Sequence, residues 1–250
     1  MPNTAALAFH AVTDNGQVRE HNEDALAVDA SLGLAILADG MGGYNAGEVA
    51  SAMAVAVVNA AVRRHAEAAS SMDAAARQDL LRRALLEANQ AVFADAQHDP
   101  EHDGMGTTLL VAWFGADRIA IAHVGDSPLF RCRDGMLHKI TRDHTVVQEQ
   151  LDAGLQTAEE ARQSPFRHLL TRAIGIDADV EVDVQEYGIA PGDIYLLCSD
   201  GLTDMLDEHE ILALLPGRHR SLQEACAALV SAANARGGTD NISVILVQVA

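Results

Sequence analysis

Basic side chains are scarce in this 250-residue sequence, and so are aromatic residues and cysteines. With 17 Lys and Arg against 36 Asp and Glu, the formal net charge is −19. Nucleic acids and anionic membranes bind proteins through Lys and Arg contacts to phosphate, so they repel such a chain. We therefore expect no nucleic-acid partner and no membrane partner. An acidic protein can still bind a phosphate group where divalent cations reverse the local charge.

The cysteines Cys132, Cys198 and Cys226 lie far apart and show no CxxC spacing. An odd and sparse set argues against a disulfide framework and is typical of a reducing compartment. The first eleven residues lack the basic segment with which a signal peptide begins. The longest apolar stretch, residues 51–62, is too short to span a bilayer. We expect a cytoplasmic protein whose thiols are small buried hydrophobic groups.

Apolar periodicity predicts strands in runs and helices in pairs. Strands are expected at 5–12, 24–29, 34–38, 107–114, 118–124, 127–132, 136–140, 180–187, 194–199 and 242–249, and helices at 47–65, 73–97 and after the capping boxes 207–210 and 221–224. Asn45 is the expected N-cap of the first helix, and Gly237-Gly238 ends the last one. The absence of βαβ alternation favours an α+β fold in which antiparallel sheets are layered against helices. No linker interrupts the chain, so residues 1–250 are expected to form a single domain.

A polar stretch from His144 to His168 has helical character but no continuous apolar face. It follows a strand-rich region and precedes the strand expected at 180–187. We interpret it as a surface flap inserted between strands.

Four aspartates stand where apolar, strand-like segments end or begin: Asp39, Asp126, Asp200 and Asp240. A single one of them is typical of a turn. Four that meet at one end of a pair of sheets would repel each other, by about 4 kcal/mol per pair at 4 Å and an effective dielectric constant near 20. Hard divalent cations, which prefer oxygen ligands, remove this repulsion and can also hold a phosphate group.

Glycines follow the first of these aspartates, in the stretch Asp39-Gly40-Met41-Gly42-Gly43. They allow the backbone to approach a ligand and to turn a carbonyl towards a metal. Upstream, Arg19 precedes Asn22-Glu23-Asp24. Its planar guanidinium is suited to a bidentate contact with phosphate, although a surface salt bridge to Glu23 is the simpler local interpretation.

Taken together, these segments resemble the metal-dependent, type 2C (PPM) serine/threonine protein phosphatases, in particular the compact bacterial members. The resemblance rests on Val18-Arg19 with Asn22-Glu23-Asp24, Ala38-Asp39-Gly40-Met41-Gly42-Gly43, Gly106-Thr107-Thr108, Val124-Gly125-Asp126-Ser127, Leu170-Thr171-Arg172-Ala173-Ile174-Gly175, Cys198-Ser199-Asp200-Gly201-Leu202 and Gly238-Thr239-Asp240-Asn241-Ile242. These motifs stand in the family's order over nearly the whole chain. The resemblance implies an αββα sandwich in which two antiparallel sheets are flanked by pairs of antiparallel helices, with a metal site at one end of the sheets.

The resemblance also implies roles for individual residues. Asp39 would bridge two Mn²⁺ or Mg²⁺ ions, the Gly40 carbonyl would complete one site, and Asp200 and Asp240 would hold the other. Asp126 would share a third, weaker ion with Asp200. Glu23 and Asp24 would act through metal-bound water, the Asn241 side chain would orient Asp240 or a bound water, and Arg19 would grip the phosphate. The reaction implied is hydrolysis of phosphoserine or phosphothreonine on proteins by an activated water, without a covalent phosphoenzyme.

Two positions depart from the family pattern. Many eukaryotic members carry a histidine, proposed as the general acid, where this chain has Met41, so the acid is open here. If one has to be sought, His144 and His168 in the flap are the first candidates. Pro128 stands where an arginine is common, which removes a charge near the third metal. His123 and His144 are interpreted as structural or surface groups.

The expected partners are phosphoserine and phosphothreonine proteins and a cognate serine/threonine kinase whose action the enzyme opposes, and the expected state is a monomer. Three alternatives stay open at this point. One is a phosphatase of small phosphate esters, another is a metal-free module that binds phosphoproteins, and the third is a phosphatase dedicated to one regulatory partner. Retention of Asp39, Asp200 and Asp240 argues against the metal-free module.

Overall fold

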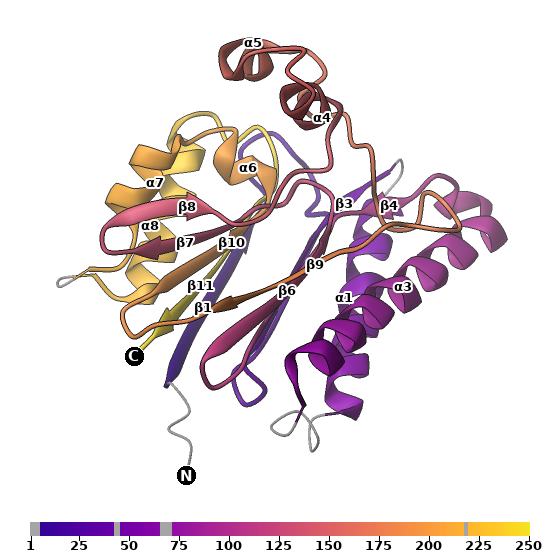
Figure 1. Cartoon of the computed structure of the whole chain (residues 1–250). Coiled ribbons are helices and arrows are strands. Elements are labelled where there is room, and N and C mark those ends of the chain that lie inside the picture. The colour runs from indigo at the N-terminus through magenta and orange to yellow at the C-terminus, as the bar shows by residue number, and fades with distance from the viewer. Residues whose placement is uncertain (1–5, 43–45, 66–71, 218–219) are drawn as a thin grey trace.

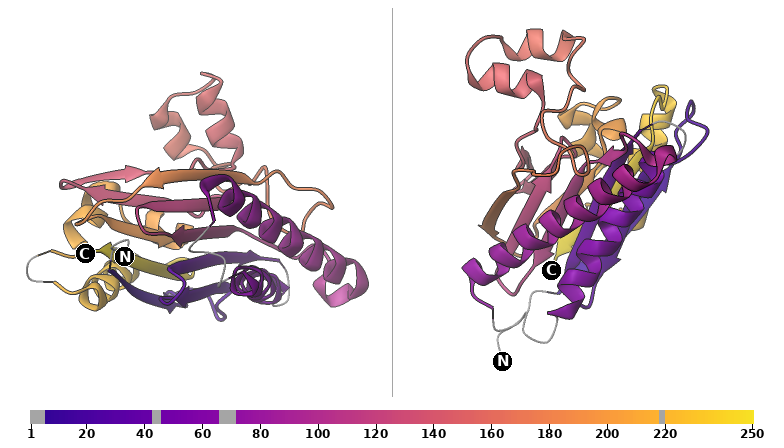
Figure 2. Two further views of the ribbon diagram at one scale, coloured as in Figure 1. Left: turned by 60° about the horizontal axis from the view of Figure 1, so that its bottom comes forward. Right: turned by 90° about the vertical axis from the view of Figure 1, so that its right-hand side faces the viewer.

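A computed structural model describes residues 6–42, 46–65, 72–217 and 220–250 of the chain. Within these ranges, eleven strands form two sheets that lie face to face, and helices cover both outer faces (Figures 1 and 2). The first sheet has the order β1-β11-β10-β7-β8. The second has the order β2-β3-β5-β6-β9, with β4 paired to β3 at one end. All strand pairs are antiparallel.

The strands are β1 (Leu7–Asp14), β2 (Asp24–Asp29), β3 (Leu34–Met41), β4 (Gly106–Thr107), β5 (Leu109–Phe114), β6 (Arg118–Val124), β7 (Leu129–Arg133), β8 (Met136–Lys139), β9 (Asp183–Gly188), β10 (Ile194–Cys198) and β11 (Ile242–Val249). The helices are α1 (Ala46–Arg64), α3 (Ala74–His98), a short 3-10 turn at Pro100–His102, α4 (Val146–Asp152), α5 (Ala158–Gln163), α6 (Asp200–Thr203), α7 (Glu208–Leu214) and α8 (Leu222–Ala235).

Three apolar clusters hold these layers together. The first joins α1 and α3 to the outer face of the second sheet, around Leu81, Leu85 and Trp113. The second joins α6, α7 and α8 to the outer face of the first sheet. The third fills the space between the two sheets and contains Tyr195 and Ile245. This is the αββα arrangement of the α+β class, so the expected fold is confirmed.

Helix α1 is long and apolar enough to cross a membrane, and within the described residues it is the only such helix. Its apolar stretch is longer than the expected residues 51–62. Half of that stretch is buried, because one side of the helix packs on β3 and α3. The composition of α1 is therefore that of a core helix. The N-cap expected at Asn45 lies outside the described residues.

Most predicted elements are present within a few residues of their expected ends. The strand expected at 127–132 begins only at Leu129, because Pro128 has no N–H to donate and the Ser127 hydroxyl is 2.7 Å from that of Thr108. The strand expected at 180–187 begins at Asp183. Helix α6 was not predicted, since four residues are too few to show a periodicity. Both capping boxes, at Asp207 and Ser221, are formed.

The stretch 144–168 contains two short helices, α4 and α5, which project from one end of the sheets (Figure 1). Thr145 caps α4 and Thr157 caps α5. Each helix buries a single side chain, Val147 and Ala161 respectively. Weak burial explains why the sequence shows no apolar stripe here, and the flap interpretation agrees with this projection from the sheets.

Candidate metal centre

The predicted acidic residues come from both sheets and meet at the end of the sandwich from which the flap projects. Asp24 is the first residue of β2 and lies opposite Asp39 near the end of β3. Asp126 follows β6, and Asp200 follows β10 as the first residue of α6. Asp240 precedes β11. The carboxylates of Asp24, Asp126, Asp200 and Asp240 all act electrostatically on that of Asp39.

The main chain of Asp39 is held by the segment Gly106-Thr107-Thr108. The Thr108 N–H donates to the Asp39 carbonyl over 2.8 Å, and the Thr107 hydroxyl donates to the same oxygen over 2.9 Å. The Asp39 N–H donates to the Thr108 hydroxyl over 2.9 Å. These contacts fix the backbone of Asp39, so its carboxylate is carried on a rigid strand.

Burial and mutual repulsion raise the pKa values of the clustered carboxyls. Burial and the carboxylates of Asp24 and Asp200 raise the pKa of Asp39 well above its usual range. Burial raises the pKa of Asp24 to about 6, and burial together with Asp200 raises that of Asp126 to about 7. Without cations, each of these carboxyl groups is therefore harder to ionise than an ordinary one.

One oxygen of this cluster lacks a hydrogen-bond partner among the described residues. The Ser199 hydroxyl donates to Asp24 Oδ2 over 2.9 Å, whereas Oδ1 of the same carboxylate is buried and unpaired. Buried polar atoms are normally satisfied by protein, water or an ion. An unsatisfied oxygen inside a set of mutually repelling carboxylates fits hard divalent cations, which bind oxygen ligands and supply the missing positive charge.

Gly40 stands where the backbone passes very close to its neighbours. A Cβ built there would lie 2.2 Å from the Gly47 carbonyl oxygen and 2.5 Å from that of Glu23. Since backbone atoms cannot yield as a flexible side chain can, only glycine fits. The Gly40 N–H donates to the Glu23 carbonyl over 3.1 Å, which ties β3 to the entry of β2.

Arg19 lies in the loop between β1 and β2 and forms an ion pair with Asp240, Nη2 to Oδ2, at 2.6 Å. The local alternative, a salt bridge to Glu23, is not formed. Half of the Arg19 side chain is exposed. The guanidinium therefore reaches the acidic centre and stays accessible to a ligand from solvent.

Asn241 acts differently from what was expected. Its main-chain N–H donates to Asp240 Oδ1 over 2.8 Å, so the backbone of Asn241 orients Asp240. Its side chain holds the β1–β2 loop instead: Oδ1 accepts from the Glu23 N–H, and Nδ2 donates to the carbonyls of Asn15 and His21. The side chain thereby fixes the loop that carries Arg19.

Sequence reasoning missed Asp204 as part of this centre, and named His168 only as a flap residue and a fallback candidate for the general acid. In the structure, His168 Nδ1 lies 3.6 Å from Asp200 Oδ2 and its Nε2 lies 3.5 Å from Asp204 Oδ2. The interaction with Asp200 raises the pKa of His168. The spacing of Asp200 and Asp204, one helical turn apart, could have indicated the pair. No local signal could have brought a flap residue to it.

His168, Asp200 and Asp204 form one of two groups of ligand-type side chains in the described part of the chain. The other consists of His123, His144 and Asp183. The second group is already neutralised by an arginine, because Arg172 Nη1 lies 3.2 Å from Asp183 Oδ1. It is a buried structural network, as was expected for the two histidines.

Comparison with known proteins gives a consistent result. Residues 13–237 match the family model described as Protein phosphatase 2C. The chain is 38% identical over 239 residues to the serine/threonine phosphatase stp of Listeria monocytogenes, covering 94% of this chain and 93% of that protein. Among solved structures, the serine/threonine phosphatase PstP/Ppp of Mycobacterium tuberculosis has a TM-score of 0.88 at 36% identity, covering 97% of this chain and 98% of that one. A catalytic domain of PstP in complex with two manganese ions has a TM-score of 0.83 at 37% identity, with 97% and 98% covered.

The chain belongs to the protein phosphatase 2C family. The resemblance seen in the sequence is thus confirmed, together with the αββα fold and the class of enzyme, a metal-dependent protein phosphatase.

Proposed function

We propose that this protein hydrolyses phosphoserine and phosphothreonine on proteins with the help of two Mn²⁺ or Mg²⁺ ions. The observation that carries this proposal is the convergence of carboxylates from both sheets on the buried Asp39, where burial and these neighbours raise its pKa well above the usual range. Two relatives whose names describe serine/threonine phosphatases, one of them holding two manganese ions, support the substrate class and the metal.

We assign the cation ligands to Asp39, the Gly40 carbonyl, Asp200 and Asp240, with Asp126 and Asp200 available to a weaker third ion. Glu23 and Asp24 lie behind them and would hold metal-bound water. When bound, the cations lower the pKa of a coordinated water and neutralise charge on the phosphate.

Arg19 supplies the phosphate contact. The Arg19 side chain is half exposed and pairs with Asp240. It can turn to a phosphate when a cation binds that carboxylate. A bidentate contact would orient the group and stabilise the negative charge on its oxygens in the transition state. Met41 cannot donate a proton, so the candidate for the general acid is His168, whose Nδ1 lies 3.6 Å from Asp200 Oδ2.

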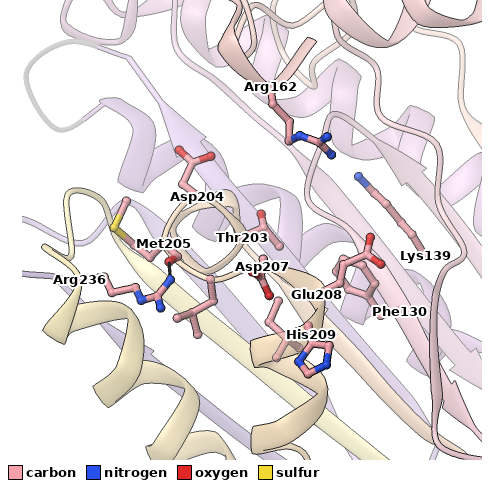
Figure 3. A pocket seen from close by; sticks show the side chains of 12 residues that line it. Phe130, Lys139, Arg162, Thr203, Asp204, Met205, Asp207, Glu208, His209 and Arg236 are labelled. Atoms are coloured by element: carbon pink, nitrogen blue, oxygen red, sulfur yellow. Dashed lines mark hydrogen bonds between the residues drawn. The ribbon is translucent and has the colours of Figure 1, made fainter. Parts of the chain in front are cut away.

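A pocket of about 820 Å³ adjoins the centre and offers room for the substrate chain on one side of the phosphorylated residue (Figure 3). The pocket is lined by Phe130, Lys139, Arg162, Thr203, Asp204, Met205, Leu206, Asp207, Glu208, His209, Ile211 and Arg236. Asp204 belongs both to this lining and to the His168 contact, so the pocket lies beside the residues that meet Asp200. Arg162 reaches it from the flap helix α5.

The decisive experiment measures hydrolysis of a phosphothreonine peptide with EDTA and after restoration of Mn²⁺. Activity should vanish in the chelator and return with the metal. Asp39→Asn should lower kcat about a thousandfold or more, roughly 4 kcal/mol of transition-state stabilisation. Asp29→Asn, at the opposite end of β2, is the matched control and should keep full activity. Full activity in EDTA would overturn the proposal.

The same assay distinguishes a protein phosphatase from a phosphatase of small phosphate esters. We propose that phosphopeptides are turned over in preference to sugar and nucleotide phosphates, because the pocket beside the centre accommodates chain on one side of the phosphate. The reverse preference would assign the enzyme to metabolites. The proposed setting is a cytoplasmic, monomeric enzyme, a single catalytic domain, that opposes a serine/threonine kinase.

A further inference from the structure

His144, the first residue of the flap, forms two hydrogen bonds with Gly125, the residue before Asp126, and a third with the far end of the flap. Its side chain is 1% exposed. The Gly125 N–H donates to His144 Nδ1 over 3.1 Å, and the His144 N–H donates to the Gly125 carbonyl over 3.1 Å. The Thr171 N–H, at the other root of the flap, donates to the His144 carbonyl over 2.9 Å. One residue thus joins both roots of the flap to the Asp126 loop.

These bonds define the tautomer of the ring. Because Nδ1 accepts a hydrogen bond from the Gly125 amide, the proton of the neutral ring is on Nε2. Nε2 faces Asp183 Oδ2 at 3.4 Å and lies 3.5 Å from Arg172 Nη1, which pairs with the other oxygen of that carboxylate at 3.2 Å. The ring also stacks on His123, with centroids 4.7 Å apart. Asp183 and His123 therefore hold the ring so that Nδ1 faces Gly125.

Gly125 has a backbone conformation that only glycine adopts readily. Its φ is +101°, and a Cβ at this position would lie 2.7 Å from the Thr108 side chain. The residue after Asp126 is tied to the same threonine, since the Ser127 and Thr108 hydroxyls are 2.7 Å apart. Asp126 therefore stands between two anchored neighbours, one held by His144 and the other by Thr108.

We propose that His144 is a positioning residue: by accepting from the Gly125 amide it sets the direction of the Asp126 carboxylate and couples the flap to it. This inference rests on the proposed function, in which Asp126 holds a divalent cation. The role excludes His144 as the general acid, because its ring is buried and both nitrogens are engaged.

Two isosteric substitutions separate positioning from packing. The Oδ1 atom of asparagine falls near the place of histidine Nδ1, so His144→Asn keeps an acceptor for the Gly125 amide. Glutamine places its polar group near Nε2 instead, so His144→Gln keeps the contact to Asp183 and loses the one to Gly125. Both variants remove the buried ring and its stacking on His123.

The measurement is Mn²⁺ titration by calorimetry, together with hydrogen exchange of the Gly125 amide. His144→Gln should weaken the weakest Mn²⁺ site about tenfold, as loss of a ligand-supporting contact does, and should unprotect the amide. His144→Asn should retain most of both. Equal losses in the two variants, at similar thermal stability, would reduce His144 to a packing role.

The unmodified protein provides a second test that does not depend on the folding of a variant. Nitrogen NMR should show His144 with Nδ1 unprotonated and hydrogen-bonded to the Gly125 amide. Protonated Nδ1 would overturn the inference. A parent protein that binds Mn²⁺ as described but fails to hydrolyse phosphopeptides would instead contradict the proposed function and leave this inference standing.

Discussion

Single side chains at the candidate centre have separable tasks, and Arg19 shows this most clearly. Its only ion pair among the described residues is with Asp240, so the arginine is bound to a proposed cation ligand rather than to a structural partner. We expect Arg19→Ala to raise KM for a phosphopeptide about tenfold and to lower kcat, because a charge-assisted bidentate contact is lost. Calorimetry should show undiminished Mn²⁺ affinity.

Arg63→Ala is the control for this prediction. Arg63 also pairs with an aspartate, Asp29, but lies at the end of α1. The Arg63→Ala variant should leave KM and kcat for the phosphopeptide unchanged. Collapse of metal affinity in Arg19→Ala, with substrate handling intact, would make Arg19 a structural residue.

Met41 leads to a prediction about the leaving group. Met41 lies two residues beyond Asp39 on the same strand, so both side chains point to the same face of β3. A thioether cannot protonate a departing oxygen, and general acid catalysis is typically worth about 10² to 10⁴ in rate. Met41→Ala should therefore keep most activity, and p-nitrophenyl phosphate, whose leaving group needs no acid, should be hydrolysed readily.

His168→Ala tests the remaining candidate acid. It should slow a phosphothreonine peptide more than p-nitrophenyl phosphate, because only the alkoxide leaving group needs a proton. Comparison of kcat across phenyl phosphates of increasing leaving-group pKa would show a steeper dependence in the variant. An unchanged slope would remove His168 from this role.

Asp193 illustrates a charge that serves stability alone. Asp193 lies between β9 and β10 and is 1% exposed. It accepts two hydrogen bonds from Arg133, the last residue of β7. Burial opposes ionisation, but the hydrogen bonds from Arg133 and Ala190 outweigh it, so the pKa of Asp193 is lowered. Asp193→Asn should reduce the free energy of unfolding by about 2 kcal/mol, a typical loss for hydrogen bonds to a charged group, with activity retained.

The pH dependence of this loss follows from the direction of the shift. A carboxyl whose pKa is lower in the folded state stabilises the fold above its unfolded pKa, near 4, and loses that contribution as the pH falls further. Urea unfolding of the two proteins should differ fully at pH 6 to 7, and the difference should shrink below about pH 4. A constant difference would contradict the lowered pKa.

At the scale of elements, the flap is the part least secured by burial. Helices α4 and α5 each bury one side chain, whereas β10 buries all five of its residues. Local opening costs least where few apolar contacts are broken. Amide exchange should therefore be much faster in 146–163 than in Ile194–Cys198. Equal protection would show that the flap is part of the rigid body.

Arg162 provides the functional test of the same element. It reaches the pocket of Figure 3 from α5 and pairs with Glu159 on the helix surface. Arg162→Glu should change KM for a phosphoprotein several-fold and leave p-nitrophenyl phosphate unaffected, since the small ester does not extend into the pocket. Arg83→Glu is the control, because it breaks a similar surface pair with Asp79 on α3. Equal effects of both variants would exclude the pocket from substrate contact.

At the scale of the whole molecule, cation binding should stabilise the fold. The two sheets each contribute carboxylates to one end of the sandwich, and their repulsion opposes packing until positive charge is supplied. Mn²⁺ at about 100 times its Kd adds about 2.7 kcal/mol per site, or roughly 5–10 °C in Tm for a chain of this size. Asp39→Asn should abolish the shift measured by thermal unfolding. An equal shift in that variant would place the stabilising ions elsewhere.

Much of the architecture could be predicted because it depends on residues that are close together in the sequence. Strands such as β6 and β11 are mostly apolar on both faces, and α7 and α8 begin at capping boxes that are complete within four residues. Prediction from the local sequence failed where contacts between distant residues determine the structure. The residues around Ser127 predict a strand, but its hydroxyl contacts that of Thr108 instead. Helix α6 is too short to show a helical periodicity.

By itself, the sequence determined the α+β class, the order of the elements and the set of aspartates, because apolar periodicity, capping and strand-end motifs act over a few residues. Only the tertiary structure decided which groups face one another. The pairing of Arg19 with Asp240, the approach of His168 to Asp200 and the bond from Gly125 to His144 join residues 19 to 221 positions apart. Such contacts depend on how two sheets and a flap pack, and no local pattern records that.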